Sequence, residues 1–403
     1  MKNIVIVGGG HAAPAAISKF LDLQFDGKIT LITNESIPPY HRPPLSKKYL
    51  MGEMETDDLL IKSRSYYETN GIELKLSTEV VKINRGEKTL ALSDGSELPY
   101  DKLLLTTGSI PRTLPDSMVE EGVTTFTLRN LADVDRIKPY FEPGKRVLII
   151  GGGYIGLEAA AVANTLELDA TLIEAAPRIL QRVAAEETSA FLREFHKGKG
   201  VTIFEDRRLK ELVKQGDHAA AIFEDGDPVS FDFALVGIGV NPATMLAEEA
   251  GINIENGIRV DDRACTSDPD IFAAGDCASF SYGGELTRLE SVQNANDQAV
   301  VAASNMAGTE AIYTPVPWFW SDQYDLKLQI AGLNRGADKV VMRPGKREGS
   351  RSHWYFAGET FIAVDAFNDA AAFMTGKRLL EAGKSPSLSD VENPDFQLKA
   401  LLR

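Results

Sequence analysis

The fold is decided by a stretch near the start of the chain, Val5-Ile6-Val7-Gly8-Gly9-Gly10-His11-Ala12-Ala13, and by its second copy, Leu148-Ile149-Ile150-Gly151-Gly152-Gly153-Tyr154-Ile155-Gly156. In each copy a short apolar run enters Gly-x-Gly-x-x-Gly/Ala, and an alanine-rich helical stretch follows. The first glycine makes a tight turn, the second lets backbone N–H groups approach a pyrophosphate, and the third small residue brings helix and strand together. The positive end of the helix then faces the anion. Two such units predict that the chain binds two dinucleotides.

The small residues of each turn and their neighbours are expected to contact the two pyrophosphates. They are Gly8, Gly10 and Ala13 in the first copy, and Gly151, Gly153, Tyr154, Ile155 and Gly156 in the second. Glu35 and Glu174 end the following strands, about 20 residues beyond each turn, where a carboxylate accepts hydrogen bonds from ribose hydroxyls. A 2′-phosphate would meet a like charge at Glu174, so we expect NADH to be preferred over NADPH. The nearby Arg178 and Arg182 would weaken that preference.

The composition is that of an ordinary globular protein, with 43% hydrophobic and 25% charged residues in a chain of 403, long enough for two or three domains. The formal net charge of −15 argues against bulk nucleic-acid binding and against an anionic membrane surface. Cys265 and Cys277 form no Cys-x-x-Cys motif, which indicates a cytoplasmic protein without a disulfide framework. The five histidines lack ligand spacing, so no metal site is expected.

Further elements are predicted from periodicity and turn residues. The N-terminus begins with a strand and shows no secretory signal, and Val147 to Leu166 predicts strand, turn and helix because glycines and Glu158 interrupt it. Strands are expected at Glu73–Ile83, Lys88–Leu92 and Lys102–Thr106, with the turn signal Asp94-Gly95 between the last two. The small-residue turn Thr107-Gly108 follows the third strand, as Gly275-Asp276 follows a later one, and both suit close passage beside a ligand. A helix is expected at Ser291–Ala307.

The character of the chain changes at Pro315, where Trp318-Phe319-Trp320 opens a region of mixed antiparallel sheet and helix. Strands are expected there at Leu326–Ala331, Lys339–Met342, Ser352–Phe356 and Thr360–Ala366, and a helix at Asp369–Ala382. The tail from Pro386 shows no clear period.

Several strings together carry a family resemblance over essentially the whole chain. Beside the two glycine turns they are Arg42-Pro43-Pro44-Leu45-Ser46-Lys47, Thr107-Gly108, Gly275-Asp276, Glu290-Ser291-Val292-Gln293-Asn294-Ala295 and Pro317-Trp318-Phe319-Trp320-Ser321-Asp322-Gln323. In these strings the chain resembles the FAD-dependent, NADH-using ferredoxin reductases of bacterial oxygenase systems, the family of putidaredoxin reductase and rubredoxin reductase. The resemblance implies an α/β fold of glutathione-reductase-like architecture.

The implied fold has two Rossmann-like domains and a C-terminal α+β domain. The FAD-binding domain would comprise residues 1–110 and 243–315, the NAD-binding domain residues 111–242, and the C-terminal domain residues 316–403. The first turn and Glu35 would then hold FAD, and the second turn and Glu174 would hold NADH, with Gly239 closing the second unit. The resemblance adds Arg42, Arg129 and the Val81 backbone near the flavin nucleotide, and Asp276 at the ribityl hydroxyls.

The resemblance also implies the reacting groups. Glu290, Ser291 and Val292 would begin a helix whose positive end faces the flavin pyrimidine. Lys47 and Glu158 would meet at the flavin–nicotinamide junction, where an ammonium stabilises charge near flavin N5. Trp320 would pack near the isoalloxazine or serve only as a core aromatic.

The expected activity is transfer of a hydride from NADH to FAD, followed by single-electron transfer to a 2Fe–2S ferredoxin that serves an oxygenase or cytochrome P450. A thiol relay is not expected, because the chain has no redox-active cysteine pair and no cysteine in Pro38–Lys47. Rubredoxin or monodehydroascorbate reduction is an alternative, as is an NADH-responsive interaction flavoprotein like apoptosis-inducing factor. The protein is expected to be a monomer or a homodimer. One candidate surface for docking the ferredoxin is a basic cluster of Arg335, Lys339, Arg343, Lys346, Arg347 and Arg351. The alternative interpretation of these residues is a solvated loop without a partner.

Overall fold

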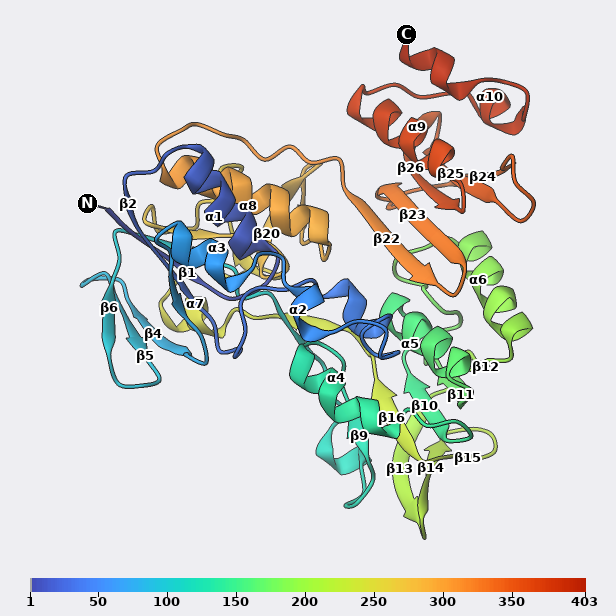
Figure 1. The fold of residues 1–403 in the computed structure, drawn as a ribbon. Coiled ribbons are helices and arrows are strands. Elements are labelled where there is room, and N and C mark those ends of the chain that lie inside the picture. Colours follow the sequence, from blue (N-terminus) through green and yellow to red (C-terminus); the bar gives the residue numbers. More distant parts are fainter. Residues whose placement is uncertain (1) are drawn as a thin grey trace. The chain divides into compact units, whose positions relative to one another are not determined.

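The computed structural model describes residues 2–403, which divide into two units (Figure 1). The first unit holds the chain up to Pro44 together with Met54–Ile110 and Val240–Pro315. The second holds Leu45–Glu53, Pro111–Gly239 and Val316–Arg403. No helix in the described residues is both long and apolar enough to cross a membrane.

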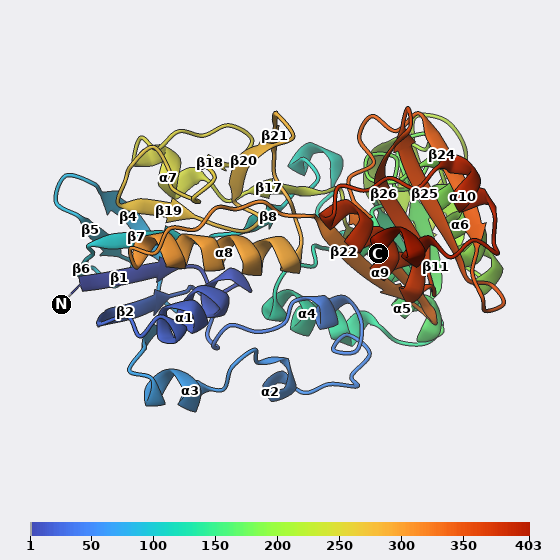
Figure 2. The ribbon, with the colours of Figure 1, turned by 90° about the horizontal axis from the view of Figure 1, so that it is seen from above.

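A five-stranded parallel sheet forms the centre of the first unit, in the order β19-β7-β1-β2-β3, part of which can be followed in Figure 2. Its strands are β1 (Lys2–Val7), β2 (Gly27–Ile32), β3 (Glu73–Lys75), β7 (Lys102–Leu105) and β19 (Ile271–Ala273). Helices α1 (Ala12–Asp22) and α8 (Val292–Met306) lie side by side and pack their alanine-rich faces with this sheet (Figure 1). Small side chains allow this close approach of helix to helix and to sheet.

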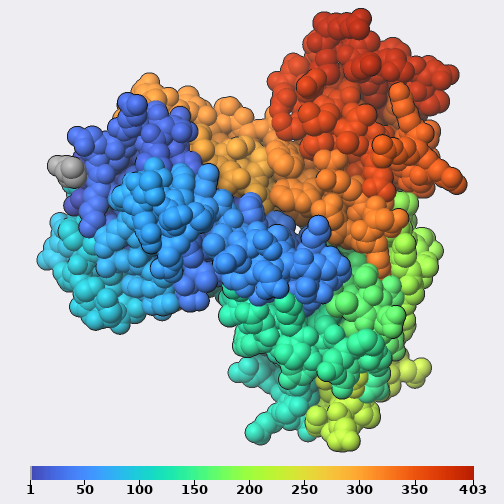
Figure 3. All heavy atoms as spheres, viewed as in Figure 1, coloured from blue at the N-terminus to red at the C-terminus, as the bar shows by residue number. Residues whose placement is uncertain are grey.

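Shorter elements complete the first unit. The helices are the 3₁₀ helix η1 (Pro43–Ser46), α2 (Thr56–Leu59), α3 (Arg64–Thr69) and α7 (Met245–Glu249). The strands are β4 (Val80–Asn84), β5 (Thr89–Leu92), β6 (Glu97–Pro99), β8 (Ser109–Pro111), β17 (Val240–Pro242), β18 (Ile258–Arg259), β20 (Ala278–Tyr282) and β21 (Glu285–Thr287). The last residues of η1 and β8 belong to the second unit. The sheet β4-β5-β6, cyan in Figure 3, lies at the surface of this unit.

One strand prediction and one turn prediction in this unit were wrong, whereas the predicted strands Lys88–Leu92 and Lys102–Thr106 are present as β5 and β7. The expected strand Glu73–Ile83 is broken into β3 and β4, because Ser77 adopts a left-handed conformation with φ 50° that ends the extended run. The Asp94-Gly95 turn is present, but it joins β5 to β6, not to Lys102–Thr106. Strand β7 instead lies between β19 and β1, because its leucines are buried on both faces as a central parallel strand requires.

The second unit contains another five-stranded parallel sheet, in the order β12-β11-β10-β16-β9. Its strands are β9 (Thr125–Phe126), β10 (Arg146–Ile150), β11 (Asp169–Ile173), β12 (Thr202–Phe204) and β16 (Phe233–Val236). Around it lie α4 (Leu131–Ile137), α5 (Tyr154–Thr165), α6 (Glu186–Lys199), the 3₁₀ helices η2 (Asp116–Met118) and η3 (Lys138–Tyr140), and the antiparallel sheet of β13 (Leu209–Gln215), β14 (His218–Phe223) and β15 (Val229–Phe231). Strand, turn and helix therefore follow one another across Val147 to Leu166, as predicted.

The C-terminal part of the second unit is a five-stranded antiparallel sheet, in the order β22-β23-β26-β25-β24. The elements are β22 (Trp318–Gln323), β23 (Leu326–Gly332), β24 (Lys339–Pro344), β25 (Arg351–Ala357), β26 (Thr360–Phe367), α9 (Ala370–Glu381), α10 (Leu388–Glu392) and the 3₁₀ helix η4 (Leu398–Leu402). The four strands and the helix expected after Trp318-Phe319-Trp320 are confirmed. The tail without a clear period nevertheless forms α10 and η4, because Ser387 caps α10 and a few apolar side chains pack with the core.

Candidate functional site

The first glycine turn connects β1 to α1 and is built for a close backbone approach. Gly8 has φ +113°, and a Cβ there would lie 2.2 Å from the Thr106 carbonyl oxygen, so only glycine fits. A Cβ at Gly10 would meet nothing within 4 Å, which leaves room beside the turn. The side chain of His11, the residue before α1, makes no capping hydrogen bond to the helix. The N–H groups at a helix start beside open space fit a pyrophosphate.

Glu35 follows β2 in the first unit and is held by two neighbours that accompany it in sequence. Its carboxylate forms an ion pair with Arg42 and accepts a hydrogen bond from the Tyr40 hydroxyl. Arg42 also donates to the Tyr40 hydroxyl at 2.7 Å, and its guanidinium lies 4.3 Å from the centre of that ring. The carboxylate proposed to bind a ribose is thus oriented by the arginine proposed to lie near the same nucleotide.

The other predicted residues of the first unit follow β7 and β19 or begin α8. Thr107 donates to the Ala243 carbonyl at 2.7 Å, and Gly108 has φ +72°. Gly275 has φ +85°, and Asp276 accepts a hydrogen bond from Ser109 at 3.1 Å. Two small-residue turns at the carboxyl ends of neighbouring strands therefore lie together beside one carboxylate.

Helix α8 begins at Val292 with a conventional cap. Ser291 accepts a hydrogen bond from the Asn294 N–H at 3.1 Å, and Glu290 pairs with Arg288 at 2.7 Å. Glu290 therefore serves the loop before the helix, while Ser291 fixes where the helix begins. Val81 lies on β4 with 49% of its surface exposed.

The second glycine turn, between β10 and α5, repeats the construction of the first. Gly151 has φ +112°, and a Cβ there would lie 2.4 Å from the Gly237 carbonyl oxygen. A Cβ at Gly156 would lie 2.1 Å from the Gly151 oxygen, which explains the third glycine. A Cβ at Gly153 would meet nothing within 4 Å, and Gly153, the residue before α5, has no side chain that could cap the helix. This turn also fits a pyrophosphate.

Glu174 is tied directly to the second turn. One carboxylate oxygen accepts the Gly152 N–H at 2.7 Å, and the other accepts the Ala176 N–H at 2.8 Å. Arg178 instead donates to the Ala184 carbonyl oxygen at 2.9 Å and to the Ser189 hydroxyl, so it is occupied within the protein. The exposed Arg182 is therefore the better placed of the two arginines predicted to moderate nucleotide preference.

Lys47 and Glu158, which are far apart in sequence, form a buried ion pair with Nζ 2.6 Å from Oε2. Only 17% of the Lys47 side chain and 6% of the Glu158 side chain are exposed. The same Glu158 oxygen accepts the Ser46 hydroxyl at 2.7 Å, and the other accepts the Ser321 hydroxyl at 2.7 Å. A buried carboxylate is stable only with such partners, and here an ammonium and two hydroxyls satisfy it.

Aromatic residues surround the start of α5 and β22. The Tyr154 ring lies 4.9 Å from that of Phe319, and burial raises the pKa of the Tyr154 hydroxyl well above its usual range. Trp320 lies beside Trp318, with ring centres 5.6 Å apart. Arg129 stands just before α4, where its N–H donates to Asp133 at 3.0 Å.

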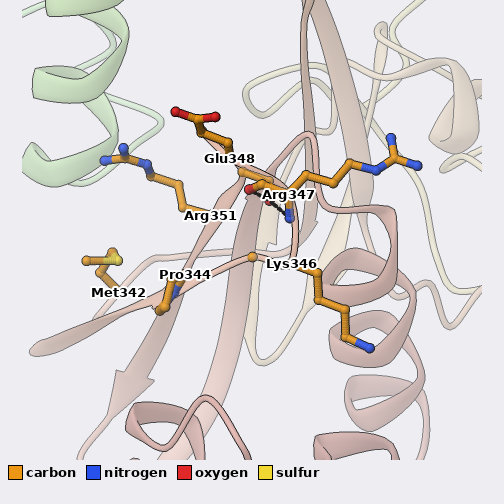
Figure 4. Close-up of a pocket in the computed structure, with 9 residues that line it drawn as sticks. Met342, Pro344, Lys346, Arg347, Glu348 and Arg351 are labelled. Atoms are coloured by element: carbon orange, nitrogen blue, oxygen red, sulfur yellow. Dashed lines mark hydrogen bonds between the residues drawn. The ribbon is translucent and has the colours of Figure 1, made fainter.

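The basic cluster predicted on the C-terminal sheet does not act as one group. The Arg343 guanidinium donates to the carbonyl oxygens of Asp390, Val391, Asn393, Pro394 and Phe396, so it holds the C-terminal segment in place. Arg351 lies 4.3 Å from the Phe191 ring centre. Lys346 and Arg347 extend away from the β24–β25 loop and line a hollow with Met342 (Figure 4). Lys346 and Arg347 are exposed, as are the two other members of the cluster, Arg335 and Lys339.

Sequence reasoning missed Tyr40, Ser46 and Ser321 as partners of the predicted site residues. All three stand in or beside strings that had been singled out, Ser46 directly before Lys47 and Ser321 directly after Trp320. Their polar side chains among apolar and aromatic neighbours were the available signal, since a buried hydroxyl needs a partner.

Comparison with known proteins agrees with this geometry. The sequence pattern of the pyridine nucleotide-disulphide oxidoreductase family matches residues 2–299, and that of the reductase C-terminal domain matches residues 318–402. The chain belongs to the pyridine nucleotide-disulphide oxidoreductase family. The 5,5′-dehydrodivanillate O-demethylase ferredoxin reductase subunit of Sphingobium is 39% identical over 99% of this chain and 98% of that protein. Putidaredoxin reductase of Pseudomonas putida is 36% identical over 94% of this chain and 91% of that protein.

Solved structures of family members are equally similar. The reductase in a covalent putidaredoxin reductase–putidaredoxin complex has a TM-score of 0.94 at 34% identity, covering 100% of this chain and 98% of that chain. A ferredoxin reductase from Rhodopseudomonas palustris has a TM-score of 0.95 at 35% identity, with 100% of both chains covered. The predicted family, the glutathione-reductase-like α/β fold and the use of FAD with a pyridine nucleotide are confirmed.

Proposed function

We propose that the protein is an NADH-dependent, FAD-containing ferredoxin reductase that delivers single electrons to a 2Fe–2S ferredoxin serving an oxygenase or cytochrome P450. The observation that carries this proposal is the buried Lys47–Glu158 ion pair in a chain with two open glycine turns. Bound FAD supplies the chemistry that accepts a hydride and releases electrons one at a time. The protein supplies placement and charge.

The first unit would hold FAD through its glycine turn, Glu35 and Asp276, with Arg42 at the nucleotide. The second unit would hold NADH through its own turn and Glu174, whose charge disfavours a 2′-phosphate. Glu158 fixes the Lys47 ammonium, and a fixed positive charge favours the arrival of negative charge during hydride transfer. The helix start at Val292 would add to this effect through its partial positive charge.

The two cysteines support a reaction without a thiol relay. Both are free, and burial raises the pKa of each thiol, so neither is a ready nucleophile. Free thiols also favour a reducing compartment, and we infer that the enzyme works in the cytoplasm. Electrons would therefore leave the flavin directly for the partner protein.

The β24–β25 loop is our candidate for docking the ferredoxin. The chain carries a net charge of −15, so an acidic partner needs a local positive surface. Lys346 and Arg347 provide one, with the exposed Met342 beside them (Figure 4). We expect Lys346→Glu with Arg347→Glu to raise the KM for ferredoxin about tenfold and to leave NADH-dependent ferricyanide reduction unchanged. Lys210→Glu with Lys214→Glu, which also reverses two exposed positive charges, on β13 of the same unit, is the control.

The function is tested by NADH-dependent cytochrome c reduction with the purified flavoprotein, without a carrier, with a 2Fe–2S ferredoxin, and with rubredoxin. A rate that depends strongly on the ferredoxin supports the proposal. A larger rate with rubredoxin would assign the alternative carrier. Slow reduction with every carrier, together with an NADH-dependent change in molecular mass, would replace the proposal by the interaction role.

A further inference from the structure

A chain of buried polar side chains continues from Glu158 beyond the ion pair. Ser321 donates to Glu158, Gln323 donates its amide N–H to the Ser321 oxygen at 3.1 Å, and the Gln323 oxygen lies 2.7 Å from His196 Nε2. Ser321 and His196 are 0% exposed and Gln323 is 1% exposed. Ser321 and Gln323 point to the same side of β22, and His196 comes from α6. The chain therefore joins the site to a helix that contains none of the site residues.

The chemistry of these groups gives every hydrogen bond one direction. An ionised carboxylate only accepts, so the Ser321 proton points to Glu158 and its oxygen must accept from Gln323. The amide nitrogen of Gln323 therefore faces Ser321, and the amide oxygen faces His196. Because that oxygen can only accept, His196 must carry a proton on Nε2. Among the described residues, His196 Nδ1 has no partner, and burial lowers the His196 pKa. His196 is therefore neutral with Nε2 protonated.

The opposite orientation of the Gln323 amide does not match hydrogen-bond donors with acceptors. With the amide turned round, Ser321 would stand between two acceptors and could donate to only one of them. One buried oxygen would then lack a partner, which proteins rarely tolerate. The chain also cannot pass a proton, because an amide in the middle would have to change tautomer. Its effect on Glu158 must be one of position.

We propose that Gln323 and His196 are positioning residues for the Lys47–Glu158 pair. Lys47 and Ser46 bind one Glu158 oxygen, and Ser321 alone among the described residues binds the other. Gln323 orients Ser321, and His196 orients Gln323. The carboxylate is thus held from both sides, and the position of the Lys47 ammonium depends on a helix outside the site. The effect on catalysis rests on the proposed role of Lys47 in flavin reduction.

The test uses Gln323→Leu, which keeps the size of the side chain and removes both polar groups, and His196→Phe as a second variant. Flavin reduction by NADH is followed in stopped flow in the FAD-loaded protein, with Lys47 present and with Lys47→Met. We expect each variant to slow reduction about tenfold when Lys47 is present and by less than twofold in the Lys47→Met background. Equal slowing in both backgrounds, or no slowing when Lys47 is present, would overturn the proposal.

A second measurement keeps the positioning role separate from the catalytic one. The rate at which an amine-acylating reagent modifies Lys47, read by peptide mass spectrometry, reports how firmly Glu158 holds the ammonium. Glu158→Gln and Gln323→Leu should both raise this rate, whereas Gln215→Leu on the exposed end of β13 should not. If the flavin of the Lys47→Met protein is reduced by NADH at the original rate, Lys47 has no role in flavin reduction. The acylation rate of Lys47 in the Gln323→Leu protein still tests whether Gln323 positions the ion pair. A Gln323→Leu protein that is acylated at the original rate rejects the positioning role.

Discussion

Glu174 offers a quantitative test of nucleotide preference. It is half-buried, and its two oxygens accept the Gly152 and Ala176 N–H groups at 2.7 and 2.8 Å. The 2′-phosphate of NADPH would bring about two negative charges to the ribose-binding carboxylate. For charge centres about 5 Å apart and an effective dielectric constant of about 40, the repulsion is about 3 kcal/mol.

The variant Glu174→Gln removes this charge and keeps an oxygen for one of the two amides. We expect the ratio of kcat/KM for NADPH to that for NADH to rise about 100-fold, which corresponds to about 3 kcal/mol. We also expect kcat/KM for NADH itself to fall about tenfold, because both backbone N–H groups lose a charged acceptor and one of them then faces the amide NH2 group. Ferricyanide reduction at constant ionic strength measures both ratios without a protein partner.

Glu211→Gln on β13 is the matched control, because it removes one negative charge from the same unit. The ratio should not change in this variant. If Glu174→Gln leaves the ratio within twofold of the original, Glu174 does not bind the ribose. If both variants shift it equally, the preference comes from net charge and the assignment is also wrong.

Three further predictions concern the ion pair, the C-terminal segment and a buried titratable cluster. Lys47→Met should slow flavin reduction by NADH about 100-fold in stopped flow while FAD stays bound, and an unchanged rate would remove Lys47 from the reaction. Arg343→Met should lower the free energy of unfolding by about 3 kcal/mol, seen as a lower Tm, because several partly buried carbonyl oxygens lose a charged donor. Lys346→Met is the control. Burial raises the pKa of Asp365 to about 6 and lowers that of His353 to about 4, and both contact Thr188. Because its pKa is raised on folding, Asp365 stabilises the fold less as pH rises from about 4 to 6. Because its pKa is lowered on folding, His353 stabilises the fold more as pH rises from about 4 to 6.5. Each of these changes amounts to about 3 kcal/mol. The two trends oppose each other in the original protein. Asp365→Asn should therefore make Tm rise more steeply with pH in this range, and His353→Gln should make it rise less steeply. Parallel plots of Tm against pH for both variants and the original would refute the titration of Asp365 and His353.

The parts of the fold that could be predicted are those in which local sequence and tertiary environment agree. Both glycine turns specify their strand and helix because Gly8 and Gly151 need a left-handed backbone against a neighbouring carbonyl. The break at Ser77 could not be predicted, because serine gives no sign of a positive φ. Strand β7 was recognised but misplaced, since its partners β1 and β19 are distant in sequence and short-range turn signals point to β5.

The site shows the same division. The Lys47–Glu158 pair was expected from a family resemblance, and the two residues do lie 2.6 Å apart. The residues around them were not expected, because Ser46, Ser321 and Gln323 look like ordinary polar residues until burial forces each to find a partner. The reverse holds for Arg343, which resembles a surface charge in sequence and is bound to carbonyl oxygens in the structure.

Helix α6 contacts the C-terminal sheet with polar side chains near both of its ends, Thr188 at Asp365 and His196 at Gln323. Exchange of the C-terminal domain between relatives is therefore not a free recombination of modules. A chimaera joined near Pro315 would inherit Asp365 and Gln323 from one parent and their partners on α6 from the other. Productive exchanges should be those in which positions 188 and 196 travel with the sheet.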